Sequence, residues 1–304
     1  MLILSHSRKK TFQHCHRLHY WKYEERLYKP DFNIHFIFGT AIDKSLEHLY
    51  KTKETKEVHA VFYQYMDIST QNEKLQEKLN EYAILGDQLL SIYIEQYNKE
   101  NIQVIDVQKP FYLGVHYNGD MIEYNKEDLD KLNNEELFFI IAGKLDMVAQ
   151  IDRLDGLYYI WDNKTTSQDK ESFKLYCEDN QQFIDYSIYG KFKYGNKFGG
   201  VIINGLNKKY LKDKTPIFRL EIEHTEDTIN GALQEFIEIA QEYYLNKSVP
   251  GLDRNRNEQF GCKPYKWNEG CEFYEPCFQL KRNENYTQTL DLFYAVKDKF
   301  DWEE

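Results

Sequence analysis

Two long stretches of the chain repeat apolar residues with the period of an α-helix. One spans residues 74–98 and the other spans residues 226–245. Apolar side chains three or four residues apart share one face of a helix, so both stretches are predicted to be amphipathic helices packed against a core. The first stripe contains Leu75, Leu79, Tyr82, Leu89, Ile92 and Tyr93, and the second contains Ile229, Leu233, Phe236, Ile237, Ala240 and Tyr244.

The region between these helices is rich in apolar, β-prone residues. They run from 138 to 151 and from 157 to 161, with the turn signal Asp155-Gly156 between them, which predicts a β-hairpin. Further strands are expected at 200–206 and 217–222, with a helix around Gln182 before them. The order helical part, hairpin, helix, strand, strand, helix predicts an α/β fold with a mixed sheet.

The loop of the hairpin decides which polar side chains share a face. A two-residue loop, Asp155-Gly156, would point Asp146 to the opposite face from Asp162 and Lys164. A three-residue loop beginning at Leu154 instead places Asp146 opposite Lys164 and diagonal to Asp162, with diagonal Cβ atoms about 7 Å apart or less. The second register is expected, because Gly156 then occupies a left-handed position that glycine adopts without steric cost.

Two aspartates and a lysine on one face suit phosphodiester hydrolysis. Mg²⁺ prefers carboxylate and water oxygens, and it can polarise a phosphodiester and lower the pKa of a bound water. Lys164 would position or help deprotonate the attacking water and offset phosphate charge. The plain alternative is a solvated strand face, since an Asp-x-Lys triplet alone occurs by chance in many charged proteins.

The order of three motifs resembles the PD-(D/E)XK nuclease superfamily. Gly143-Lys144-Leu145-Asp146 matches its G-(R/K)-hydrophobic-D pattern, and Asp162-Asn163-Lys164 matches the strand that ends D/E-x-K. Gln182 and Tyr186, four residues apart on one helical face, match its Q-x-x-x-Y helix. The resemblance runs from about Ser7 to Cys277 and is to the RecB-like and AddB-like branch with an iron-sulfur cluster, which includes CRISPR-associated adaptation exonucleases and many phage proteins.

This resemblance implies a restriction-endonuclease-like core and extends the metal site. The segment 38–47 resembles the family's G-x-x-x-H, and Asp43 stands where the metal-binding His usually lies. Because Asp is an oxygen ligand for Mg²⁺ or Mn²⁺, the expected metal ligands are Asp43, Asp146 and Asp162. His48 is expected to be an ordinary helix residue. The strand at 107–111 lacks the acidic residue often seen there, so no ligand is assigned to it.

Four of the five cysteines fit the family's split cluster. Cys15 lies near the N-terminus, and Cys262, Cys271 and Cys277 lie near the C-terminus. Thiolates ligate either a [4Fe–4S] cluster or Zn²⁺; the cluster is expected on family grounds, with zinc as the alternative. Cys177 is interpreted as an unpaired thiol. A disulfide framework is disfavoured because Met1-Leu2-Ile3-Leu4 is too short for a signal peptide.

A metal at these cysteines would clasp the two ends of the chain, since its binding free energy is also folding free energy. The chain has no Pro/Ser/Gly-rich linker and no internal repeat, and its 41% hydrophobic content suffices for a core. A single nuclease domain over residues 1–304 is therefore expected. Its parts would be a helical part at about 34–100, a core at about 104–245, and a cysteine segment at about 255–282 joined to Cys15.

The net charge of −11 argues against a broad phosphate-binding surface, because contacts to phosphates usually need basic residues. Local basic runs could still border a narrow channel that takes a single strand. They are Arg8-Lys9-Lys10, Lys208-Lys209 with Lys212 and Lys214, and Lys281-Arg282. An acidic exterior also suits a protein that works within a recombination or replication complex.

The expected function is a divalent-metal-dependent exonuclease acting on single-stranded DNA or DNA ends in recombination, repair or phage DNA metabolism. No stretch approaches the roughly 20 apolar residues of a membrane span, so a cytoplasmic location is expected, in the host if the protein is viral. One alternative is a non-catalytic DNA-binding or scaffold subunit of the same fold, held by an iron-sulfur or zinc centre. Another is an unrelated cysteine-metal module in which the Asp-x-Lys match is accidental.

Overall fold

The computed structural model describes residues 1–30, 33–68, 70, 72–97, 99–132, 137–151, 156–209, 216–248, 262 and 270–297. The chain forms two compact units. Unit 1 comprises Met1–Phe32, Tyr112–Ala142 and Gln234–Glu304, and unit 2 comprises Asn33–Phe111 and Gly143–Leu233. Lys212, Lys214 and most of the expected cysteine segment, at 255–261 and 263–269, lie outside the described residues.

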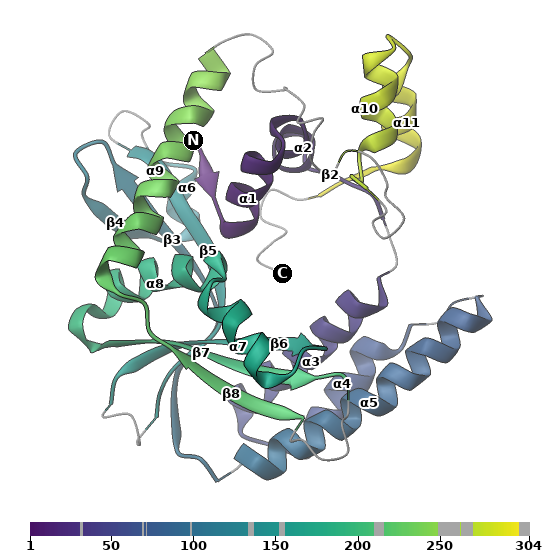
Figure 1. The fold of residues 1–304 in the computed structure, drawn as a ribbon, viewed down its shortest axis with the longest axis vertical. Coiled ribbons are helices and arrows are strands. Elements are labelled where there is room, and N and C mark those ends of the chain that lie inside the picture. Colours follow the sequence, from purple (N-terminus) through teal and green to yellow (C-terminus); the bar gives the residue numbers. More distant parts are fainter. Residues whose placement is uncertain are drawn as a thin grey trace. The chain divides into compact units, whose positions relative to one another are not determined.

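The described residues form the helices and strands drawn in Figure 1. The helices are α1 (His6–His14), α2 (His16–His19), α3 (Ile34–Thr52), α4 (Val58–Met66), α5 (Glu73–Tyr97), α6 (Lys126–Leu129), α7 (Lys170–Glu178), α8 (Gln181–Tyr194), α9 (Glu226–Ser248), α10 (Tyr274–Lys281) and α11 (Tyr286–Phe293). The strands are β1 (Ile3–Leu4), β2 (Leu27–Tyr28), β3 (Ile102–His116), β4 (Met121–Tyr124), β5 (Leu137–Ile151), β6 (Tyr158–Thr166), β7 (Phe198–Asn207), β8 (Ile217–Ile222) and β9 (Ala295–Val296). The two predicted amphipathic helices are confirmed as α5 and α9.

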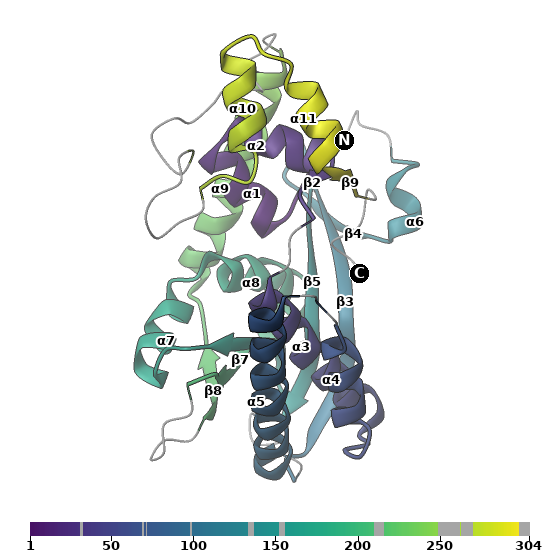
Figure 2. The ribbon, with the colours of Figure 1, turned by 90° about the vertical axis from the view of Figure 1, so that its right-hand side faces the viewer.

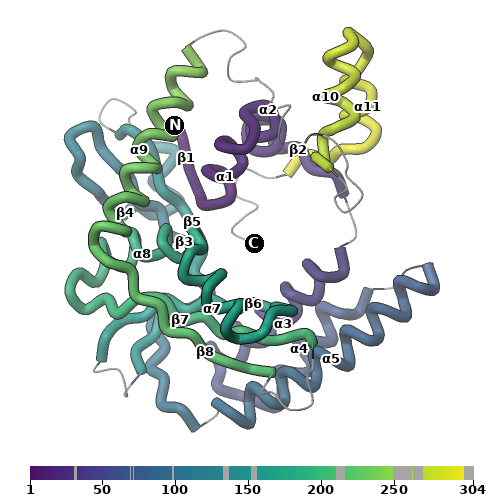
Figure 3. Tube along the Cα trace, in the orientation of Figure 1, coloured from purple at the N-terminus to yellow at the C-terminus, as the bar shows by residue number. Residues whose placement is uncertain are grey.

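The main sheet is mixed, as predicted, and the α/β class is confirmed. Its strand order is β4-β3-β5-β6-β7-β8, and β1 pairs with β5 in addition. β6 and β7 are parallel, whereas β5 with β6 and β7 with β8 are antiparallel. Parallel neighbours need a crossover connection. Here α7 and α8 supply it between β6 and β7, as the chain trace in Figure 3 shows.

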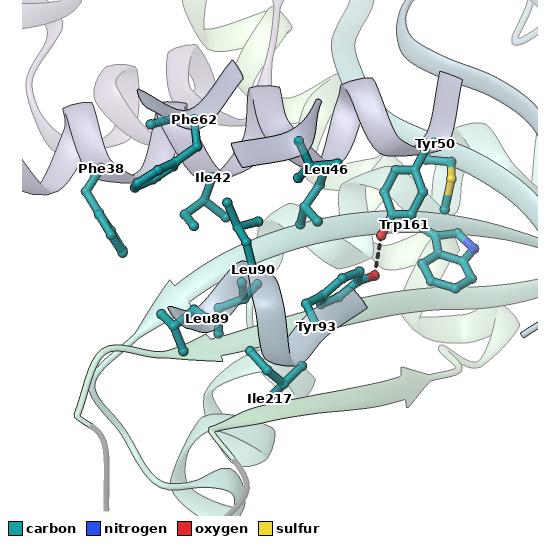
Figure 4. Close-up of a cluster of buried hydrophobic side chains, with 14 of the residues drawn as sticks. Phe38, Ile42, Leu46, Tyr50, Phe62, Leu89, Leu90, Tyr93, Trp161 and Ile217 are labelled. Carbon is teal, nitrogen blue, oxygen red and sulfur yellow. Dashed lines mark hydrogen bonds between the residues drawn. The ribbon is translucent and has the colours of Figure 1, made fainter. Parts of the chain in front are cut away.

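The core of unit 2 lies between the sheet and the helices α3, α4 and α5, which lie side by side in Figures 1 and 2. Figure 4 shows side chains from α3, α4 and α5 meeting Trp161 of β6 and Ile217 of β8. The α3 helix starts at Asn33, whose side chain accepts hydrogen bonds from the amides of His35 and Phe36. Because one face of α3 is buried in this core, the polar residues beside that face are held close to β6.

The hairpin of β5 and β6 has a different register from the one predicted. Gln150 pairs with Tyr158, which excludes both of the predicted loops, at 155–156 and at 154–156. The pairing continued by one residue beyond Met147 and Trp161 places Asp146 opposite Asp162 rather than opposite Lys164. Leu154 and Asp155 of the predicted turn lie outside the described residues, and Gly156 does take a left-handed φ of 70°.

The predicted register was wrong because it assumed that Gly156 ends a tight turn between directly paired residues. In the structure the described pair nearest the loop is Gln150 with Tyr158, and the side chain of Gln150 donates a hydrogen bond to the carbonyl of Gly156. The observed register differs from the predicted one by two positions. An even shift keeps every side chain on its face, so Asp146 and Asp162 still share one.

Unit 1 holds the two ends of the described chain. The buried ammonium of Lys9 on α1 lies 2.7 Å from the carboxylate of Glu235 on α9. A small apolar cluster joins Trp21 to Phe273 and Cys277 of the segment around α10, and the rings of Trp21 and Phe273 lie 5.4 Å apart. Across the described residues, no helix combines the length and apolar character needed to cross a membrane.

Candidate active site

The strand β6 carries a close pair of opposite charges. The Nζ of Lys164 lies 2.5 Å from Oδ2 of Asp162, and the Asp162 side chain is only 2% exposed. The ammonium also lies 5.8 Å from the centre of the Phe183 ring on α8. Side chains two positions apart on a strand point to the same face of the sheet, which explains why Asp162 and Lys164 meet.

Asn163, between these two residues, contacts the other two predicted metal ligands. Its backbone amide donates to Oδ2 of Asp146 over 2.8 Å, and its side-chain Nδ2 donates to Oδ1 of Asp43 over 3.4 Å. The other oxygen of Asp43 accepts a hydrogen bond from Nε2 of Gln108 over 3.1 Å. The structure therefore brings the predicted residues Asp43, Asp146 and Asp162 into one neighbourhood in unit 2.

The backbone of Gln108 is unusual. Its φ of 52° lies in the left-handed region, which non-glycine residues seldom adopt and which costs about 1–3 kcal/mol. A change of backbone conformation within a strand changes the direction of a side chain. Here the side chain of Gln108 contacts Asp43. The strand thus supplies a hydrogen-bond donor to the site where the family usually supplies an acidic residue.

The electrostatics of the site show an excess of negative charge. Burial raises the pKa of Asp146 well above its usual value, and the charges of Asp162 and Asp43 raise it further. Burial also raises the pKa of Asp43 and of Asp162. Burial acts to lower the pKa of Lys164, but the charges of Asp162 and Asp146 outweigh it, so that pKa is raised. The ammonium of Lys164 thus faces three carboxylates, and a divalent cation would relieve the repulsion between them.

The donor set fits Mg²⁺ or Mn²⁺, because all three candidate ligands offer carboxylate oxygens. Among the described residues, no three His, Cys, Asp or Glu side chains already stand in a metal-binding arrangement. The carboxylates are held by donors of the protein instead, Asp162 by Lys164 and Asp146 by the amide of Asn163. Their convergence on one ion stays a prediction.

Gln182 and Tyr186 lie together on α8, as their spacing predicts. Nε2 of Gln182 donates to the Tyr186 hydroxyl over 2.7 Å, and that hydroxyl donates to the carbonyl of Lys144 over 3.1 Å. Burial raises the pKa of Tyr186 well above its usual value, and the charge of Asp162 adds to the shift. The phenol therefore keeps its proton and ties α8 to the strand that carries Asp146.

The sequence model of the PD-(D/E)XK nuclease superfamily matches residues 3–278. The chain belongs to the PD-(D/E)XK nuclease superfamily. Membership implies nuclease activity on DNA, and nucleases of this superfamily typically use Mg²⁺ or Mn²⁺. A comparison with curated proteins gave no significant match. The match extends over residues of both units, and the assignment of residues 1–304 to a single domain stays a prediction.

In this PD-(D/E)XK protein, Tyr186→Phe is expected to weaken substrate placement rather than chemistry. The change removes the hydroxyl that joins Gln182 to the carbonyl of Lys144 and keeps the buried ring. Loss of such a hydrogen bond costs about 1–3 kcal/mol when a buried partner stays unsatisfied. Steady-state cleavage measured over a range of DNA concentrations should show a raised KM with a smaller change in kcat. A large fall in kcat at an unchanged KM would contradict this role.

The sequence interpretation missed Glu47, an acidic residue close to Asp43. Glu47 lies one turn after Asp43 on α3, pairs with Lys44 over 2.9 Å and Lys51 over 2.5 Å, and its charge helps raise the pKa of Asp43. The four-residue spacing from Asp43 was a signal that could have found it. His48 lies 3.4 Å from Glu57, on the same helix as Asp43.

Four cysteines of unit 1 line one small pocket, together with Arg17, Trp21 and Phe273. They are the predicted set Cys15, Cys262, Cys271 and Cys277. Burial raises the pKa of Cys271 to about 11, and the other three thiols contribute to that shift. Cys177 belongs to unit 2, where burial and then the charge of Asp162 raise its pKa to about 12. Thiols are the ligands that soft metals prefer, but these described cysteines do not yet stand in a metal-binding arrangement, so a metal centre here stays a proposal.

Proposed function

We propose that the protein is a divalent-metal-dependent DNA exonuclease of the RecB-like and AddB-like branch that acts on single strands or DNA ends. The observation that carries the proposal is the buried contact between Lys164 and Asp162 beside Asp146, in a chain of this superfamily. Three neighbouring carboxylates and one lysine are a costly arrangement for stability alone, since burial opposes each charge. Their retention at one place favours a catalytic role over a scaffold role.

In this proposal Asp43, Asp146 and Asp162 hold the divalent ion. When bound there, the ion would polarise the scissile phosphodiester and make water a stronger nucleophile. Lys164 is protonated at neutral pH, because neighbouring carboxylates raise its pKa. It therefore acts as a donor that orients the attacking water and offsets charge on the phosphate. Asp162 and the Phe183 ring hold the ammonium in that position.

The preference for single strands or ends rests on charge. With a net charge of −11, the protein has little general attraction for duplex phosphates, and local lysines would have to guide a strand. An acidic protein of this kind would reach DNA most readily as part of a recombination, repair or replication complex, or in phage DNA metabolism.

The cysteine pocket is proposed to hold a [4Fe–4S] cluster, with zinc as the alternative. Cys15, which lies between α1 and α2, lines the same pocket as the thiols of the segment around α10, although they are distant in sequence. A metal there would hold the ends of unit 1 together and would take no part in hydrolysis.

Cleavage of labelled oligonucleotides tests the proposed activity. Protein purified without air should degrade linear single-stranded DNA when Mg²⁺ or Mn²⁺ is added and should leave circular single strands intact. Labels at either end give the polarity. Asp162→Asn, which keeps the size of the side chain, is the matched control and should be inactive. If metal-loaded protein with an intact cysteine centre cuts neither single-stranded nor duplex DNA, the non-catalytic scaffold is the better interpretation.

A further inference from the structure

A row of polar side chains crosses three strands of unit 2 and ends at the candidate metal site. Asn163 of β6 pairs with Asn204 of β7, and Asn204 pairs with Arg219 of β8. Nε of Arg219 donates to Oδ1 of Asn204 over 2.9 Å, and Nδ2 of Asn204 donates to Oδ1 of Asn163 over 2.9 Å. Nδ2 of Asn163 in turn donates to Asp43 over 3.4 Å. Neighbouring residues of the sheet thus form one continuous hydrogen-bonded chain.

The chemistry of Arg219 fixes the direction of this chain. A guanidinium only donates hydrogen bonds, so the atom of Asn204 that faces it must be the carbonyl oxygen. The amide nitrogen of Asn204 then faces the other way, and its two hydrogens go to Asn163 and to the Tyr50 hydroxyl, 3.0 Å away. Asn163 must turn its oxygen to Asn204, which leaves its own NH₂ group facing Asp43.

Arg219 is itself held firmly. Its side chain is 6% exposed, forms an ion pair with Glu100 and donates to the Tyr93 hydroxyl over 3.3 Å. The guanidinium carbon lies 3.9 Å from the ring centre of Tyr97 and 4.4 Å from that of Trp161. Aromatic faces and a carboxylate on several sides leave the planar group one orientation. The guanidinium from which the chain of hydrogen bonds starts is therefore held rigidly.

We propose that Arg219 and Asn204 are positioning residues for the metal site, because they force Asn163 to present a donor to the carboxylate of Asp43. The inference rests on the proposed function, in which Asp43 is a metal ligand. With the amide of Asn163 reversed, a carbonyl oxygen would face the carboxylate and push it away. Hydrogen-bond partners behind a metal ligand are worth about tenfold to a hundredfold in metal affinity or activity.

Asn204→Asp tests the direction of the chain with almost no change in size. Arg219 keeps the new carboxylate ionised, so both of its oxygens accept hydrogen bonds and Asn163 must turn its NH₂ group away from Asp43. An effect of charge alone would tighten binding of a cation, whereas reversal of Asn163 should weaken it. The two explanations therefore predict opposite signs.

Binding of Mn²⁺ alone is measured by calorimetry on the full-length protein without DNA. Mn²⁺ binding that is lost in Asp162→Ala defines the site. Asn204→Asp is expected to raise the Kd of that site about tenfold to a hundredfold. Asn230→Asp, which adds the same charge at an exposed position of α9, should leave it unchanged. An unchanged or lower Kd in Asn204→Asp overturns the proposal.

A second variant tests the same proposal if Asn204→Asp does not fold. Arg219→Met combined with Glu100→Gln removes the donor and its counter-ion but keeps an apolar stem against Tyr97 and Trp161, and it should also raise the Kd. An unchanged Kd there would equally overturn the proposal. If Asp162→Ala binds Mn²⁺ as the wild type does, the proposed metal site itself is wrong. Normal Asp162-dependent binding with no effect of Asn204 or Arg219 rejects only the positioning role.

Discussion

Replacing Lys164 with alanine is expected to slow DNA cleavage about a hundredfold to ten-thousandfold while Mn²⁺ and DNA still bind. The ammonium lies 2.5 Å from Asp162, and its charge acts to lower the pKa of both Asp162 and Asp146. Removing it deletes the donor that orients water and offsets phosphate charge. The carboxylates that would hold the ion are all kept, so the loss should fall on kcat.

Asp162→Ala should be as inactive as Lys164→Ala for a different reason. It removes a candidate ligand, so Mn²⁺ binding measured by calorimetry should be lost. Both variants should therefore be inactive, but only Lys164→Ala should still bind Mn²⁺. This contrast separates the role of Asp162 as a metal ligand from the role of Lys164 in orienting water. Lys174→Ala is a matched control on α7, because Lys174 pairs with Glu178 at the helix surface and should retain wild-type cleavage. Wild-type cleavage by Lys164→Ala would refute the assigned centre.

Local patterns in the sequence predicted the elements well. The apolar periodicity of 74–98 and 226–245 matches α5 and α9 within a few residues, and the strand expected at 217–222 is β8 itself. Helical and strand periodicities are set by neighbours along the chain, so they can be read without tertiary information. The register of the β5–β6 hairpin could not be obtained this way. It is set by pairing between the two strands, such as Gln150 with Tyr158, and local periodicity does not encode that pairing.

The candidate site could likewise be predicted from the sequence only in part. Asp146, Asp162 and Lys164 were found because motif order places them on adjacent strands. Asn163 was treated only as the spacer of the Asp-x-Lys motif, although its backbone and side chain contact two of the three carboxylates. Such a role depends on residues of β7 and β8 that are distant in sequence. Only the assembled sheet brings them together.

The pocket of four cysteines leads to the prediction with the largest effect on stability. Cys271→Ser is expected to abolish metal binding in unit 1 and to unfold the segment around α10. Structural metals in small cysteine sites contribute about 10–16 kcal/mol of binding free energy, whereas the net stability of a protein is about 5–15 kcal/mol. Among the described residues, Trp21, Phe273 and Cys277 are the buried members of the apolar cluster there and its other side chains are partly exposed, so packing alone is not expected to replace that contribution.

Metal content and proteolysis of anaerobically purified protein measure this effect. Wild-type protein should contain iron and show the visible absorption of a [4Fe–4S] cluster, and residues 270–297 should resist limited proteolysis. Cys271→Ser should lose the metal, the absorption and the resistance together. Cys177→Ala is the matched control, because Cys177 lies in unit 2 and makes no contribution to the pocket. Zinc in place of iron would keep the clasp and reject the cluster, whereas a metal-free, equally stable wild type would reject both.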